Sequence, residues 1–133
     1  MTRLFADTSY YLALLSRNDE VHSQALKLTP DLTAPMVTTG FVLTELVDAM
    51  SRAPWRPLAV EFVRGLCNDG RVDVVPASQQ LFDAGLNLFA QRQDKDWSLT
   101  DCISFVVMRE RGIADALTAD RHFEQAGFNV LIK

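Results

Sequence analysis

Residues 3–11 of the chain, RLFADTSYY, decide where the fold begins. Leu4, Phe5 and Ala6 form a short apolar run of the kind found in buried β-strands, and a helical pattern follows it. Asp7 stands where the strand ends, and an apolar interior excludes an Asp side chain unless that side chain is paired or binds a metal ion. The stretch therefore predicts a strand and then a helix, with Asp7 either capping the helix or holding a ligand.

Short apolar runs continue to alternate with longer helical patterns along the chain. Because strands separated by helices pair in parallel through right-handed crossovers, we expect an α/β fold. It would be a three-layer α/β/α sandwich with a short-stranded, mostly parallel five-stranded sheet, formed by residues 1–133 as a single domain. The predicted strands are 4–6, 36–39, 72–75, 115–118 and 128–132, and the predicted helices are 8–16, 19–28, 41–52, 58–68, 79–92, 98–111 and 120–125. Pro54 and Pro57 are expected to interrupt the chain between two of these helices.

The composition limits the kind of protein that this chain forms. Its 133 residues are 48% hydrophobic and carry a net charge of −4, which gives no general attraction to nucleic acid or to an anionic membrane. Apolar runs fall short of the roughly 20 residues that cross a bilayer, and the N-terminus has no signal-peptide pattern, so a cytoplasmic protein is expected. Cys67 and Cys102 are expected to be reduced, mostly buried thiols. His22 and His122 have no companion at zinc-ligand spacing.

Four acidic residues fall where the predicted elements meet one edge of the sheet. Asp7 and Asp120 follow strands, Glu45 lies early in the helix after the second strand, and Asp101 lies in the first turn of the helix 98–111. Each has an ordinary explanation as a helix cap or a flanking residue. In open parallel sheets, however, ligands bind beyond the carboxyl ends of the strands, and all four acids would converge there.

Carboxylates that are crowded together repel one another, and without a cation one or more of them would take up a proton. A hard divalent cation removes that conflict, and Mg²⁺ is usually held by a few carboxylates together with waters and substrate phosphates. Since no set of His or Cys ligands is present, Mg²⁺ or Mn²⁺ is favoured over Zn²⁺. The pattern therefore predicts an acidic metal site made of Asp7, Glu45, Asp101 and Asp120.

Four strings carry a resemblance that runs from residue 4 to about residue 132: FADTS, TELVDAM, SLTDCISFVVMRERG and ALTADRHFEQAGF. They resemble PIN-domain proteins of the kind found as the VapC toxins of bacterial toxin–antitoxin systems. The resemblance implies a Mg²⁺- or Mn²⁺-dependent ribonuclease in which the four acids are the catalytic and metal-binding residues. It also implies a homodimer, an antitoxin partner that blocks the site, and supporting hydroxyl groups on Thr8, Ser98 and Thr118.

Other side chains have less specific roles at this level. His122 lies near Asp120 in the sequence, but the resembling family does not require a histidine there, so a packing role is favoured. Trp55 and Trp97 are of the type that stacks on bases, although tryptophans pack more often. Several arginines are candidates for phosphate contacts: Arg52, Arg56, Arg64, Arg109, Arg111 and Arg121. Of these, Arg109 and Arg111 lie near the far end of their helix, where contacts with its C-terminus or with solvent are favoured.

Two other functions stay open from the sequence. A phosphatase or phosphotransfer domain also has an acidic Mg²⁺ pocket on a doubly wound sheet, but a phosphatase of that kind would carry a D-x-D motif where this chain has Asp7-Thr8-Ser9. The alternative is a non-catalytic domain that binds RNA or a protein partner and uses the acids only as helix caps. The RNA target, the number of metal ions and the identity of an antitoxin cannot be derived from the residues.

Overall fold

The computed structural model describes residues 3–29 and 34–132 of the chain. In chain order its elements are β1 (Leu4–Ala6), α1 (Thr8–Leu15), α2 (His22–Leu28), β2 (Met36–Thr39), α3 (Gly40–Ala49), the 3-10 turn η2 (Ala53–Trp55), α4 (Arg56–Asn68), β3 (Val72–Val75), α5 (Gln79–Gln91), α6 (Leu99–Glu110), β4 (Asp115–Leu117), α7 (Arg121–Gln125) and β5 (Asn129–Val130). Within this part of the chain, no helix has the length and apolar character needed to cross a membrane.

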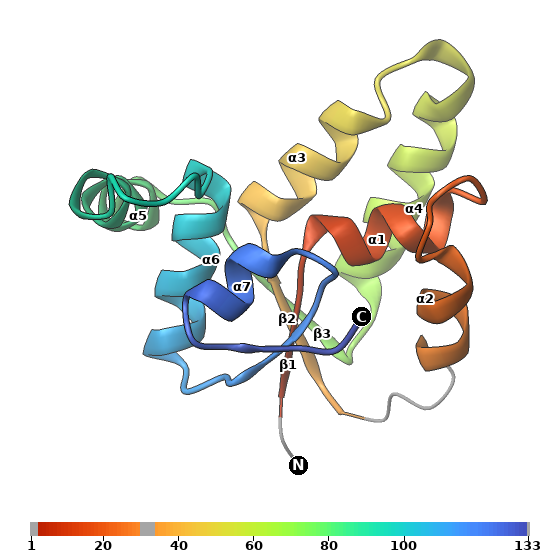
Figure 1. Cartoon of the computed structure of the whole chain (residues 1–133). Helices are drawn as coiled ribbons and strands as arrows, with labels where there is room; N and C mark the ends of the chain where they lie inside the picture. The colour runs from red at the N-terminus through yellow and green to blue at the C-terminus, as the bar shows by residue number, and fades with distance from the viewer. Residues whose placement is uncertain (1–2, 30–33, 133) are drawn as a thin grey trace.

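The strands form one parallel sheet in the order β3-β2-β1-β4-β5. The chain winds outward from β1 to β3 and then returns to the other side of β1 to form β4 and β5. In Figure 1, α5 and α6 lie to one side of the sheet and α1, α2 and α4 lie to the other. The three-layer arrangement and the parallel five-stranded sheet predicted from the sequence are therefore confirmed. All three residues of β1 are buried, as expected for the central strand of a sheet covered on both faces.

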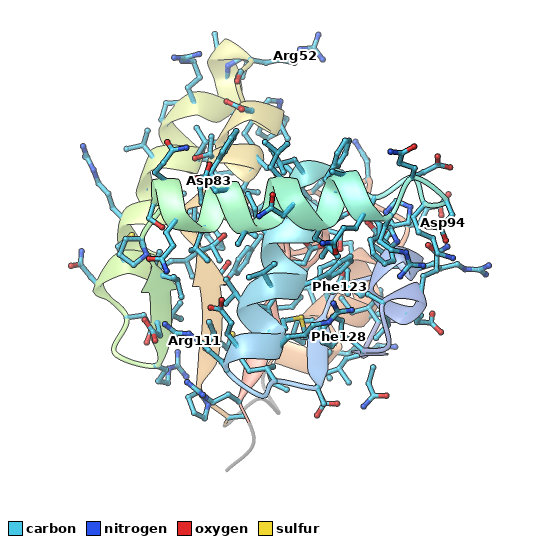
Figure 2. The ribbon with its side chains drawn as sticks, turned by 90° about the vertical axis from the view of Figure 1, so that its left-hand side faces the viewer. Arg52, Asp83, Asp94, Arg111, Phe123 and Phe128 are labelled. Carbon is cyan, nitrogen blue, oxygen red and sulfur yellow. The ribbon has the colours of Figure 1, made fainter. Side chains whose placement is uncertain are left out.

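Aromatic rings fill the space between α6 and α7. The ring of Phe105 lies 4.9 Å from that of Phe123 and 5.0 Å from that of Trp97, both edge to face, and 5.7 Å from that of Phe128. Figure 2 shows Phe123 and Phe128 beside α6 and below the end of α5. Trp97 is only 3% exposed, and its indole N–H donates a hydrogen bond of 3.0 Å to Gln125. The predicted packing role of Trp97 is confirmed.

The observed elements differ from the predicted ones mainly at their ends. The helix α4 begins at Arg56, two residues before the predicted start, and Pro57 lies inside its first turn. Proline is tolerated there because the first N–H groups of a helix have no acceptor within the helix. The prediction that Pro57 interrupts the chain is therefore wrong, whereas Pro54 does lie between α3 and α4, in η2.

Two smaller expectations also need correction. The last strand covers Asn129–Val130 instead of 128–132, because it is a short edge strand that pairs with β4 alone. Cys102 is buried and Cys67 is exposed, so only one of the two thiols is buried as expected. Both are free, in agreement with the sequence.

The contact between α5 and α6 depends on a glycine. A Cβ atom placed on Gly85 would overlap the Ile103 side chain and lie 3.2 Å from the backbone nitrogen of the same residue. Gly85 is buried, and its lack of a side chain lets α5 approach the helix that carries Asp101. Gly65, in the middle of α4, has no atom within 4 Å of the same position.

We expect opposite effects from alanine at these two glycines. Alanine is favoured over glycine in a helix by about 1 kcal/mol, so Gly65→Ala should stabilise the protein by up to about that amount. Gly85→Ala should destabilise it by a net ~1–2 kcal/mol, since overpacking costs about 1–3 kcal/mol and outweighs the gain in helix propensity. Urea unfolding of both variants measures the difference. Equal stabilisation by both would contradict the close α5–α6 contact.

Candidate active site

The pairing of β1 with β4 places Asp7 next to Thr118. Ala6 is opposite Leu117 in the register, and the N–H of Asp7 donates to the carbonyl of Leu117 at 3.1 Å. One residue further along each strand, the Thr118 hydroxyl donates a hydrogen bond of 2.8 Å to Oδ2 of Asp7. The Ser9 hydroxyl donates to the same oxygen at 3.2 Å, and Asp7 is the N-cap of α1. Asp7 is thus a helix cap that is also fixed against the neighbouring strand.

Asp101 is held at the start of α6 by a capping box. The Ser98 hydroxyl accepts a hydrogen bond from the N–H of Asp101 at 3.0 Å, and Oδ2 of Asp101 accepts one from the N–H of Ser98 at 3.2 Å. Asp101 is only 7% exposed. The capping interaction predicted from the sequence is confirmed, and it fixes a largely buried carboxylate in one position.

Asp120 and His122 complete a compact group with Asp101. Asp120 caps α7 by accepting a hydrogen bond of 2.9 Å from the N–H of His122. The imidazole Nδ1 of His122 lies 2.8 Å from Oδ2 of Asp101 and 3.4 Å from Oδ1 of Asp120. Each of these three residues offers a ligand atom, and the three atoms lie within 4.8 Å of one another. Asp101 and Asp120 therefore lie together, as predicted.

Glu45 approaches from α3, which begins at the carboxyl end of β2. The Thr39 hydroxyl caps this helix by accepting a hydrogen bond of 3.1 Å from the N–H of Val42, and Glu45 follows within the next turn. Its side chain is half-buried, as expected for a residue at the margin of the core. The charge of Glu45 acts on Asp7, which places the two carboxylates at the same edge of the sheet. Glu45 and Asp7 lie outside the tight group formed by the other two acids and His122.

The hydroxyls that the resemblance singled out have different contacts. Thr118 bonds directly to Asp7, and Ser98 holds Asp101. The hydroxyl of Thr8 instead donates to the carbonyl of Val42 at 3.5 Å and links α1 to α3. Thr118 and Ser98 therefore support acids of the site, and Thr8 supports the packing of the helices that carry them.

The pKa values of the acids reflect their burial and how closely they lie together. Burial is the largest cause that raises the pKa of Asp7, to about 6, and the charges of Asp101 and Glu45 add to it, while the hydrogen bond from Thr118 opposes it. Burial also raises the pKa of Asp101, with a contribution from the charge of Asp120, while the hydrogen bond with His122 opposes it. The four acids are thus linked electrostatically from one to the next, and a cation at this edge of the sheet would relieve their repulsion.

The pKa of His122 is also raised, which for a histidine favours the charged form of the ring. Burial lowers the pKa of His122, but its hydrogen bond with Asp101 and the charges of Asp120, Asp101 and Asp96 outweigh burial and raise the pKa. The ring belongs to the acidic group and does not play the packing role that the sequence favoured. One feature of the sequence indicated part of this arrangement. His122 follows Asp120 by two residues at the start of a short helix, and this spacing turns the ring toward the carboxylate of Asp120, the N-cap of α7.

The hydrogen bonds to the three aspartates gather on one oxygen of each carboxylate. Among the described residues, hydrogen bonds reach only Oδ2 of Asp7, only Oδ2 of Asp101 and only Oδ1 of Asp120. The second oxygen of each carboxylate is left for another partner. Oxygen donors of this kind, with Glu45 beside them, fit a hard divalent cation better than a soft one. Ser9, which no motif in the sequence indicated as a site residue, also donates a hydrogen bond to Oδ2 of Asp7 and leaves Oδ1 without one.

A five-stranded parallel sheet with acids from four segments at its carboxyl edge is the architecture of a PIN domain. The PIN-domain family model matches residues 4–129, so the chain belongs to the PIN-domain family. It is 30% identical over 126 residues to the 23S rRNA-specific endonuclease VapC20 of Mycobacterium tuberculosis, covering 94% of this chain and 95% of the relative. The crystal structure of Mycobacterium tuberculosis VapC20, a Sarcin-Ricin loop cleaving toxin, matches with a TM-score of 0.85 at 27% identity over 94% of this chain and 95% of that one.

More distant structures share the fold. FitAcB from Neisseria gonorrhoeae matches with a TM-score of 0.67 at 13% identity, covering 96% of this chain and 95% of that chain. The DNA-bound VapBC from Salmonella typhimurium matches with a TM-score of 0.65 at 16% identity, covering 98% of this chain and 97% of that chain. At these identities the likeness concerns the fold alone. The resemblance to PIN-domain proteins that the sequence strings carried is confirmed.

The raised pKa of Asp7 gives a testable dependence of stability on pH. The folded pKa of about 6 lies above the ordinary value of 3.8 for an aspartate, so ionising Asp7 costs stability as the pH rises through about 6 in metal-free protein. Asp7→Asn removes the charge, so it should stabilise the metal-free protein at pH 7.5, by on the order of 2–3 kcal/mol at most, and give little or no gain at pH 4. Urea unfolding in EDTA at the two pH values measures this.

Asp69 provides the matched control for this prediction. The hydrogen bonds from Arg71 lower the pKa of Asp69, so Asp69→Asn should not stabilise the protein at pH 7.5. An Asp7→Asn protein that is less stable than the wild type at pH 7.5 in EDTA would contradict the strained carboxylate described above.

Proposed function

We propose that this chain is a metal-dependent endoribonuclease and the toxin of a toxin–antitoxin pair. The observation that carries the proposal is the convergence of Asp7, Glu45, Asp101 and Asp120 at one edge of the sheet, with free oxygens on the three aspartates. The similarity to an rRNA endonuclease over nearly the whole chain supports the same activity. Residues 1–133 would act together as one nuclease domain.

In this proposal the four acids hold Mg²⁺ or Mn²⁺. Asp7, Asp101 and Glu45 are the preferred ligands, directly or through water, and Asp120 either holds a second ion or orients the attacking water. A bound divalent ion would lower the pKa of a water and offset the charge on the phosphate. Carboxylate and water ligands are those that such ions prefer, and the metal-ligating group found among the described residues, Asp101, Asp120 and His122, contains no thiol.

The protein's own groups hold this site in place. Thr118 and Ser9 fix Asp7 through hydrogen bonds to Oδ2, so Oδ1 would be the oxygen that holds the ion. The imidazole Nδ1–H of His122 donates to Oδ2 of Asp101 and so sets the direction of the other oxygen of that carboxylate. Because its ring also lies 3.4 Å from Asp120, His122 is a positioning residue for two of the acids.

RNA is the proposed substrate. The first candidate is 23S rRNA, because VapC20, the relative that is 30% identical, is named as a 23S rRNA-specific endonuclease. An antitoxin is the proposed partner, since several structures with this fold are toxin–antitoxin complexes. We further propose a homodimer, and action in the cytoplasm, where ribosomal RNA is found. Incubating the protein with a pool of cellular RNA, with and without Mn²⁺, and mapping the cut ends would identify the substrate.

The rival functions differ from this proposal in specific chemistry. A phosphotransfer enzyme would form an aspartyl phosphate, which acetyl phosphate or a similar donor would reveal, whereas the proposed nuclease forms none. A domain that only binds RNA or a partner would use the acids as caps alone. In that case Mn²⁺ would not change the Tm, and Asp101→Asn would lose no function.

Removing one acid should abolish cleavage without unfolding the protein. We expect Asp101→Asn to lower the rate of RNA cleavage by at least about a hundredfold. A neutral amide lacks the negative charge with which the carboxylate would hold the divalent ion, and that ion would stabilise charge on the phosphate in the transition state. Millimolar Mn²⁺ should raise the Tm of the wild type and raise that of Asp101→Asn less, since a ligand that binds only the native state stabilises it. Asp83→Asn, on the exposed face of α5, is the control and should behave as the wild type. Cleavage by Asp101→Asn at the wild-type rate would refute the assignment.

The role of His122 can be tested by replacing its ring. His122→Ala should lower cleavage by about 10- to 100-fold, the range typical for partners that orient metal ligands. In His122→Asn the amide nitrogen takes the place of Nδ1, so this variant should recover a large part of the activity. If His122→Asn were as impaired as His122→Ala while both stayed folded, the hydrogen bond to Asp101 would not be the function of this residue.

A further inference from the structure

The chain from Ser51 to Asn68, which follows α3 and contains η2 and α4, differs in charge from the rest of the protein. It contains three arginines, Arg52, Arg56 and Arg64, and a single acid, Glu61, so its formal charge is +2. The whole chain has a net charge of −4. A local excess of positive charge on an acidic protein indicates a surface that meets a negatively charged partner.

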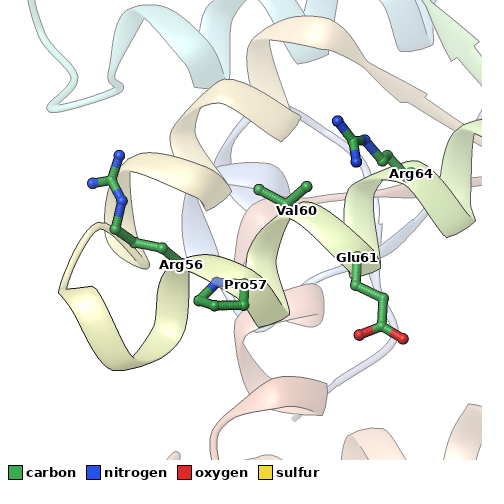
Figure 3. Close-up of a pocket in the computed structure, with 5 residues that line it drawn as sticks. All are labelled: Arg56, Pro57, Val60, Glu61 and Arg64. Atoms are coloured by element: carbon green, nitrogen blue, oxygen red, sulfur yellow. The ribbon is translucent and has the colours of Figure 1, made fainter.

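Two of these arginines lie on one face of α4. Arg56, Val60 and Arg64 are spaced four residues apart, which places them on the same side of a helix. Figure 3 shows these three side chains on one side of α4, with Glu61 pointing to the other side. With Pro57 and Glu61 they line a shallow pocket of about 520 Å³. The apolar floor at Val60 is thus flanked by two guanidinium groups, and we call this surface the arginine face.

The guanidinium groups of this segment are not neutralised by acids. Within the described part of the chain, Arg52, Arg56 and Arg64 form no ion pair, and Arg56 donates only to the carbonyl of Ser51, at 3.0 Å. Three of the seven other arginines do form ion pairs: Arg71 with Asp69, Arg92 with Asp94, and Arg111 with Asp73. Unpaired guanidinium groups keep their donors for a phosphate, which they can bind with two parallel hydrogen bonds.

An exposed tryptophan stands beside these cations. Trp55 ends η2 between Arg52 and Arg56, and half of its surface is exposed. The other tryptophan, Trp97, is buried, so of the two only Trp55 is available to an external ring. Aromatic side chains interspersed with basic ones are the combination that binds single-stranded nucleic acid, because bases stack on the rings while the cations contact the backbone.

The position of this segment relates it to the acids. The helix α3 starts at the carboxyl end of β2, carries Glu45, and leads directly into the segment. Glu45 is the sixth of the ten residues of α3, so about 6 Å of helix separates it from the end of α3, and Trp55 follows six residues after that end. Figure 1 shows α3 and α4 as a hairpin that projects past the edge of the sheet. An RNA cut at the acids would therefore reach the hairpin through nucleotides that flank the cleaved bond.

We propose that the arginine face and Trp55 form an RNA-binding platform for nucleotides flanking the cleavage site. Arg56 and Arg64 bind backbone phosphates, and Trp55 stacks on an unpaired base. The platform determines how tightly the RNA is bound and leaves the chemical step to the acids. This inference rests on the proposed ribonuclease function.

The test compares two double variants that each lose two positive charges. Arg56→Ala/Arg64→Ala changes the arginine face, and Arg71→Ala/Arg111→Ala changes two arginines at the opposite, amino edge of the sheet. The probe is an RNA hairpin with the Sarcin-Ricin loop sequence of 23S rRNA, or the mapped site if the wild type cuts elsewhere. We expect the first variant to raise KM by about tenfold or more and leave kcat within about twofold, with a salt slope reduced by roughly 1.4 for two lost phosphate contacts on a single strand. The control should change KM by less than about twofold.

Two further variants complete the experiment. Trp55→Ala should raise KM by roughly tenfold through lost stacking, and Arg56→Lys/Arg64→Lys should recover part of the affinity because the charge returns. An unchanged KM in Arg56→Ala/Arg64→Ala, or an equal loss in the control, would overturn the platform. So would normal RNA binding combined with lost affinity for the antitoxin, since the face would then bind the partner protein. If the wild type cuts no RNA with Mg²⁺ or Mn²⁺, the proposed function itself fails.

Discussion

Hydrogen bonding between β1 and β4 positions the first carboxylate of the site. These two strands are distant in the sequence and adjacent in the sheet, and they lie where the winding of the chain reverses. The register that sets Ala6 against Leu117 brings Asp7 and Thr118 side by side at the carboxyl edge, and Asp120 follows two residues later. A shift of one residue would turn Asp7 to the other face of the sheet. The reversal of winding is also where open parallel sheets bind their ligands.

The site has a cost in stability that the rest of the structure offsets. Burial and neighbouring charges raise the pKa of Asp7 to about 6, so at neutral pH the folded protein holds a carboxylate in surroundings that disfavour its charge. Hydroxyl donors from Thr118 and Ser9 reduce this penalty, and His122 does the same for Asp101. Strain of this kind is common at functional sites, where a bound cation recovers what the empty arrangement loses.

The fold could be predicted from the sequence because its strands are continuous apolar runs and its helices carry clear start and stop signals. Asp7 and Asp120 could be located because they follow strands, and strand ends in a parallel sheet share one edge. Asp101 was harder to place, since α6 begins at this edge only because α5 and the following loop return the chain there. The role of His122 could not be predicted, because its contact with Asp101 depends on the angle between α7 and α6. The spacing of apolar residues along the chain does not indicate that angle. Nor did the sequence distinguish Trp55 from Trp97, because the packing that buries Trp97 involves residues on two later helices, α6 and α7.

The central claim is that water attacks an RNA phosphate at the edge where the four acids meet. In such a hydrolysis the bond between phosphorus and the 3′ oxygen breaks, and a bond between phosphorus and a solvent oxygen forms. The most direct test is to let the wild-type protein cut its RNA in ¹⁸O-labelled water with Mg²⁺ and to analyse the new ends by mass spectrometry. The account predicts a 3′ hydroxyl and a 5′ phosphate that carries ¹⁸O. A 2′,3′-cyclic phosphate, formed by attack of the RNA's own 2′ hydroxyl, would contradict it.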